Sequence, residues 1–109
     1  MKRILGAALG LALLAVPVWA ALGYTSVSAT STAQTTTINA STLVVVNDDA
    51  TNEVYVRVFV DGETVADATT ASAEIKKGES FTFTKDFNIK AISIVCASGE
   101  TATVRLFYW

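Results

Sequence analysis

The stretch that decides the fold is Val54-Tyr55-Val56-Arg57-Val58-Phe59-Val60. Valine occupies every second position, and Tyr, Arg and Phe lie between, so the hydrophobic period is two, as in a β-strand with one buried face. The next two residues are Asp61-Gly62, a dipeptide that favours a tight turn. The chain should therefore reverse direction at this point and continue as an antiparallel neighbour.

Similar strand signals occur at short, regular spacing on both sides of this stretch, with further turns expected at Lys77-Gly78 and Ser98-Gly99. The other expected strands are residues 43–46, 63–66, 71–76, 79–84, 89–96 and 101–109. Strands this close together leave no room for helical crossovers. The pattern predicts an all-β fold, an immunoglobulin-like antiparallel sandwich of about seven strands over residues 38–109. Its expected core is Val44, Val54, Val56, Val58, Val60, Ile75, Phe81, Phe83, Ile92, Ile94, Val104 and Leu106.

The N-terminal third differs in composition from the rest. Residues 1–23 carry Lys2 and Arg3 directly after Met1 and no charge beyond them, as in a signal peptide cleaved after Val18-Trp19-Ala20. A retained hydrophobic helix preceding the sandwich is the alternative, in which residues 4–22 contact the membrane. Residues 24–37 are mostly Ser, Thr and Ala, a composition typical of a linker. Asn39 begins an Asn-Ala-Ser sequon and is a glycosylation candidate.

Composition argues against several classes of function. The chain has no histidine, which is the commonest general base and zinc ligand, and Cys96 is its single cysteine. We therefore expect no catalytic residues, no cofactor and no enzymatic activity. The formal net charge is −2, without a basic cluster, so nucleic acid is not an expected partner. On its strand, Cys96 is expected to be a small buried thiol, with an intermolecular disulfide as the alternative.

Oxygen-rich side chains gather in residues 47–53, where Asp48, Asp49 and Glu53 are weak calcium candidates. Because Asp and Asn are also common turn residues, a turn without metal is the alternative.

Large aromatic residues alternate with the expected core positions on two strands. Tyr55 and Phe59 should face outward if their valine neighbours face inward, and Phe107 and Trp109 should do the same on the last strand. A contiguous exposed apolar patch usually marks an interface. These four residues are the predicted interface, although the last strand could instead kink and bury its rings. Exposed aromatic rings also suit stacking on sugars, so glycan binding is the alternative use.

The layout of a basic start, an apolar segment, a Ser/Thr-rich hinge and a small β head resembles the archaeal type IV pilins and related filament subunits. The head, notably residues 56–63 and 77–81, is similar to prokaryotic surface immunoglobulin-like adhesion modules. The pilin resemblance implies that the helices form the core of a filament and that the heads lie outside it.

Two functions follow from this sequence. The first is a non-enzymatic exported structural protein at the cell surface or outside the cell, a subunit of a pilin-like filament or envelope layer that acts by self-association. The alternative is a secreted module, cleaved from its signal peptide, that recognises glycan or protein through exposed aromatic residues.

Overall fold

The structure, a computed structural model, describes residues 22–109, apart from the side chains of Lys85 and Asp86. It contains six strands, which are β1 (Gly23–Ala29), β2 (Gln34–Asn47), β3 (Val54–Val60), β4 (Ala73–Ile75), β5 (Ser80–Val95) and β6 (Ala102–Tyr108). All pairings are antiparallel, in the order β1-β6-β2-β5-β3-β4. The predicted all-β antiparallel class is confirmed.

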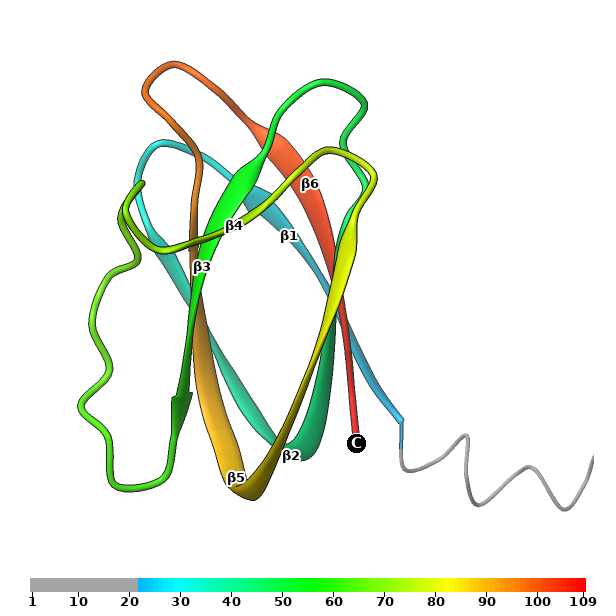
Figure 1. The fold of residues 1–109 in the computed structure, drawn as a ribbon, viewed down its shortest axis with the longest axis vertical. Coiled ribbons are helices and arrows are strands. Elements are labelled where there is room, and N and C mark those ends of the chain that lie inside the picture. Colours follow the sequence, from blue (N-terminus) through cyan, green and yellow to red (C-terminus); the bar gives the residue numbers. More distant parts are fainter. Residues whose placement is uncertain (1–21) are drawn as a thin grey trace, which may run out of the picture.

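The two long strands β2 and β5 each run through both halves of the fold (Figure 1). The register between them shifts on either side of Ala40, and extra residues of this kind bend a strand. In the first half, which we call the β1–β6 half, β6 pairs with residues 43–47 of β2. In the second, the β3–β4 half, β3 pairs with residues 89–95 of β5. The sheet thus folds over on itself.

A single hydrophobic core lies between the two halves. Leu43, Val45, Val104 and Leu106 come from the β1–β6 half and are fully buried. The opposite half supplies Ile38, Val54, Val56, Ile75, Ile89, Ile92 and Ile94. At about 25 cal/mol per Å² of apolar surface, this shared burial is the main term that stabilises the fold.

The topology differs from the immunoglobulin-like sandwich that the sequence predicts. That fold has two separate sheets, whereas here β2 and β5 belong to both halves and the first strand pairs with the last. Residues 23–29 and 34–37, expected in a linker, are strands. Threonine is β-branched and favoured in strands, so this Thr-rich stretch can pair in a sheet although it is mostly polar. The expected apolar helix lies outside the described residues.

The expected turns are present, whereas several expected strand and core positions differ. Gly62 and Gly78 have φ angles of 92° and 74°, which supports the expected turns. Residues 63–66, however, form a loop rather than a strand. Leu43 and Val45 are buried in place of Val44, and Phe81 remains 43% exposed. Val58 and Val60 are half-buried at the margin of the core.

Candidate assembly surface

An aromatic row crosses the outer face of the β1–β6 half. Tyr24 of β1 lies opposite Phe107 of β6, and Phe107 lies opposite Val44 of β2. The rings of Tyr24 and Phe107 have their centroids 5.1 Å apart at an angle of 49°. Tyr24 is 53% exposed and Trp109, two residues after Phe107, is 51% exposed. We call these four residues, Tyr24, Val44, Phe107 and Trp109, the aromatic patch.

The alternation of the strands explains why this face is apolar. Val104 and Leu106 point into the core with no exposed surface, so Arg105 and Phe107 must point outward. On β1, Val27 and Ala29 are buried and Tyr24, Ser26 and Ser28 are exposed. Arg105 forms a salt bridge with Asp48, at 3.1 Å between Nη2 and Oδ1. A polar margin therefore borders the aromatic patch.

The end of β6 is fixed by backbone hydrogen bonds to the bend in β2. The Trp109 carbonyl accepts from the Ser41 and Thr42 amides at 3.0 and 3.1 Å, and the Trp109 amide donates to the Thr42 carbonyl at 3.1 Å. These bonds continue the contact with β2 one residue beyond the end of β6, without the kink that the alternative interpretation required.

The other two predicted interface residues lie on the β3–β4 half, away from this patch. Tyr55 and Phe59 face outward from β3, but Phe59 is only 2% exposed. The loop of residues 61–72 crosses this face, where the Ala68 amide donates to Ser93 Oγ at 2.9 Å. The Arg57 guanidinium also lies 5.2 Å from the centre of the Phe59 ring. Phe59 is therefore packed within the subunit.

Tyr55 is half-buried next to acidic neighbours. Burial raises the pKa of its hydroxyl, and the negative charges of Glu74 and Glu53 raise it further. The structure thus brings Phe107 and Trp109 together and separates both from Tyr55 and Phe59. Tyr24 joins the patch instead. Its position on a strand differs from the linker expected over residues 24–37, although Val27 and Ala29 alternate there with serines.

The carboxylates of the calcium candidate loop hydrogen-bond to the protein itself. Asp49 Oδ2 accepts from the Asn52 amide at 2.8 Å and from the amide and hydroxyl of Thr51 at 3.1 Å. These hydrogen bonds lower the pKa of Asp49. Asp48 pairs with Arg105 instead. Among the side chains that the structure describes, those of His, Cys, Asp and Glu form no group of three or more that could hold a metal ion, and Glu53 belongs to no such group.

A buried asparagine ties this loop to the rest of the domain. Asn47 is fully buried, and its Nδ2 donates to the Asn52 and Ile75 carbonyls at 2.9 and 3.0 Å. Its Oδ1 accepts from the Asp49 amide at 3.1 Å. The loop geometry thus follows from internal hydrogen bonds.

The remaining candidate residues are Cys96 and Asn39. Cys96 is buried, and burial raises the pKa of its thiol. Its amide donates to the Thr30 carbonyl at 2.8 Å. Asn39 is exposed on β2, where its Oδ1 accepts from Asn88 Nδ2 at 3.2 Å.

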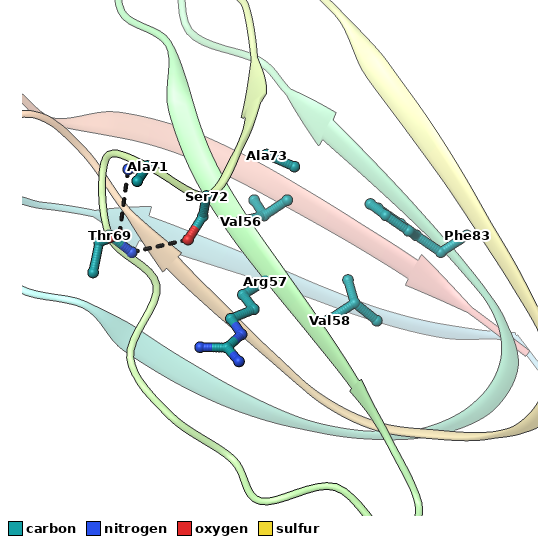
Figure 2. A pocket seen from close by; sticks show the side chains of 8 residues that line it. All are labelled: Val56, Arg57, Val58, Thr69, Ala71, Ser72, Ala73 and Phe83. Atoms are coloured by element: carbon teal, nitrogen blue, oxygen red, sulfur yellow. Dashed lines mark hydrogen bonds between the residues drawn. The ribbon is translucent and has the colours of Figure 1, made fainter.

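A pocket of about 520 Å³ opens beside β3 (Figure 2). Arg57 is the one ionisable residue in its lining, which is otherwise Val56, Val58, Thr69, Ala71, Ser72, Ala73 and Phe83. The Thr69 amide donates to Ser72 Oγ at 3.0 Å, and the Ala71 amide donates to Thr69 Oγ1 at 3.2 Å. This lining contains no pair of groups for acid–base chemistry.

Within residues 22–109, no helix has the length and apolar character needed to cross a membrane. No curated protein matches the chain. A family model does match, and it is described as Enas, endospore appendages, rather than as type IV pilins. The resemblance to archaeal pilins is therefore not supported, whereas the broader expectation of a subunit of surface appendages agrees with the family. Because the match spans residues 23–107, well over half of the chain, the chain belongs to the endospore appendage family.

Proposed function

We propose that this protein is the repeating structural subunit of a filamentous appendage on the spore surface and that it works by self-association. The observation that carries this proposal is the family match over residues 23–107, which includes β1 to β5 and all but the last residue of β6. The sandwich is then the building block, and its extracellular location follows from that role.

The aromatic patch is the surface that we propose for contact between subunits. The exposed rings of Tyr24 and Trp109 lie on the outer face of the sheet, and sheet faces pack on one another about 10 Å apart in other β proteins. Covering a half-exposed Tyr24 or Trp109 ring contributes about 1 kcal/mol each, from the area removed from water. The free energies of many such weak contacts, repeated along a filament, together stabilise the assembly.

No catalytic role is proposed. The chain has no histidine, and the carboxylates of Asp48 and Asp49 hydrogen-bond to neighbouring groups of the protein. Self-association through an apolar surface needs neither a cofactor nor a titrating group.

The test compares two substitutions at similarly exposed aromatic residues. Tyr24→Ser removes a ring from the aromatic patch, and Phe81→Ser removes a 43% exposed ring from a different face of the molecule. We expect the unaltered protein and Phe81→Ser to form filaments that sediment and are visible by electron microscopy. Tyr24→Ser should leave a larger soluble fraction. Equal assembly by Tyr24→Ser and the unaltered protein would remove the patch from the proposal.

Glycan binding is a second candidate, favoured by the adjacent rings of Tyr24 and Phe107. In that case the protein would be a secreted, monomeric module. It should then bind an insoluble polysaccharide such as chitin, and Tyr24→Ser should reduce the bound fraction. Absence of binding to a panel of polysaccharides would contradict this candidate.

A further inference from the structure

The pocket of about 520 Å³ beside β3 has a polar side and an apolar side. Figure 2 shows Arg57, Thr69 and Ser72 on one side of the β3 ribbon. The side chains of Val58 and Phe83 lie on the other side. Sites for small ligands commonly have volumes of about 300–1,000 Å³ and combine an apolar wall with a few placed polar groups. This pocket has both properties.

The polar side of the pocket offers hydrogen-bond donors. Thr69 Oγ1 accepts from the Ala71 amide at 3.2 Å, and Ser72 Oγ accepts from the Thr69 amide at 3.0 Å. A hydroxyl that already accepts still has its own hydrogen to donate, and neither hydroxyl donates to a protein group in the described part of the chain. The guanidinium of Arg57 adds further donors and no acceptor. This side therefore favours an anionic group.

Arg57 is held in place by its neighbour on the same face of β3. Its Cζ atom lies 5.2 Å from the centre of the Phe59 ring, and Phe59 is packed within the subunit. Contact with a fixed ring orients the planar guanidinium and leaves N–H groups at its edge available. Among the described residues the guanidinium has no carboxylate partner, since the salt bridge found there joins Arg105 to Asp48. A ligand carboxylate would form the charge-assisted pair that Arg57 lacks.

The acidic residues on the neighbouring segments do not fill this role. Glu63 borders an adjoining pocket that Arg57 also lines, but its Oε1 accepts from the Val60 amide at 2.8 Å. Asp67 and Glu74 line two other pockets, to which Arg57 does not contribute. The guanidinium is thus the one charged group in the lining of the 520 Å³ pocket.

The apolar side of the pocket reaches the margin of the core. Val58 and Phe83 are half-buried and pack against the core, and Val56 beside them is only 2% exposed. An alkyl chain that covers Val58 and Phe83 is removed from water together with them, which favours binding. Lys85 and Asp86 come shortly after Phe83 in the sequence, and their opposite formal charges cancel. An uncharged chain therefore suits this side.

We propose that the pocket beside β3 binds small anionic amphiphiles, molecules that carry a carboxylate on an apolar chain, such as medium-chain fatty acids. The carboxylate pairs with Arg57 and accepts from the hydroxyls of Thr69 and Ser72, and the chain covers Val58 and Phe83. The aromatic patch contributes no residue to this pocket, so the inference does not depend on filament formation.

Equilibrium dialysis of the full chain against radiolabelled decanoate tests the proposal, because it measures binding whether or not the protein assembles. We expect saturable binding that Arg57→Gln weakens at least about tenfold, as for the loss of a charge-assisted hydrogen bond. The matched control is Lys77→Gln, which removes the same charge from an exposed turn and should bind as the unaltered protein does. Arg57→Lys keeps the charge without the planar fork and should bind with intermediate affinity, which gives a second measurement if Arg57→Gln does not fold.

Two competitors separate the charge from the apolar chain. Acetate has the carboxylate alone and decanol has the chain alone, so each should displace labelled decanoate much less effectively than unlabelled decanoate does. Equal displacement by decanol, equal binding by Arg57→Gln and Lys77→Gln, or the absence of saturable binding would overturn the proposal. If decanoate does not bind and Arg57→Gln instead prevents filament formation, Arg57 pairs with a carboxylate of a second copy and the proposal fails. Failure of the unaltered protein to form filaments would contradict the proposed assembly and leave the binding result unchanged.

Discussion

The Tyr24 ring packs against the Phe107 ring across the pairing of β1 with β6, with 5.1 Å between the ring centroids. This contact joins the first described strand to the last. It also places an aromatic pair on the outside of a sheet whose inner side is already filled by Val104 and Leu106. The account of assembly given above rests on this pair.

The pair should show measurable coupling. In a double-mutant cycle with Tyr24→Ala and Phe107→Ala, the free energy of unfolding should reveal about 0.5–1.5 kcal/mol of interaction, as for other tilted aromatic pairs. The measurement is urea denaturation under conditions where the protein is monomeric. Tyr24→Phe keeps the ring and is the matched control. Additive effects of the two alanine substitutions would show that the rings do not stabilise each other.

Asn47 should be among the most sensitive positions for stability. Asn47→Ala leaves the Asn52 and Ile75 carbonyls and the Asp49 amide without their side-chain partner. We expect a loss of about 2–4 kcal/mol in the free energy of unfolding, because buried polar groups left unpaired are costly. Asn39→Ala, at an exposed position, should cost less than about 0.5 kcal/mol. Equal losses from both would contradict the role given to Asn47.

Asp49 should make stability depend on pH in the acid range. The Asn52 and Thr51 amides lower its pKa in the folded protein below the ordinary 3.8, so the charged form favours folding. Its contribution is present above pH 3.8 and is lost as the pH falls through the folded value. Thermal unfolding should show the protein more stable than Asp49→Asn near neutral pH, with the gap closing in acid. Asp67→Asn, at an exposed loop position, is the control; a gap independent of pH would contradict this assignment.

The sequence predicts which face of a strand is apolar better than it predicts what covers that face. Valine alternation in β3 correctly turns Phe59 away from the core, yet the residue 61–72 loop buries it, and no periodicity in β3 encodes that loop. In residues 43–46 every side chain is apolar, so the pattern does not distinguish Val44 from its buried neighbours Leu43 and Val45.

The sequence of β1 does not indicate a strand, for a related reason. Residues 24–37 lack large apolar side chains apart from Tyr24 and Val27, and a linker is the usual interpretation of such a composition. The pairing of β1 depends on β6, more than seventy residues later in the chain, and long-range pairing of this kind leaves little local signal. Val27 and Ala29, which alternate with Ser26 and Ser28, are the signal that was present.

Cys96 should react slowly in the folded protein. Its side chain is buried and its pKa is raised, so the reactive thiolate is scarce and inaccessible. Iodoacetamide labelling followed by mass spectrometry should be much slower in buffer than in denaturant. The same burial predicts that copies of the chain do not cross-link through this thiol while folded. Rapid labelling of the native protein would contradict its placement in the core.

The central claim is that the protein is a structural subunit of spore-surface appendages, and immunogold electron microscopy of spores tests it most directly. Antibodies raised against the folded protein should label appendages repeatedly along their length. Gold confined to the spore body, with appendages present and unlabelled, would contradict the account.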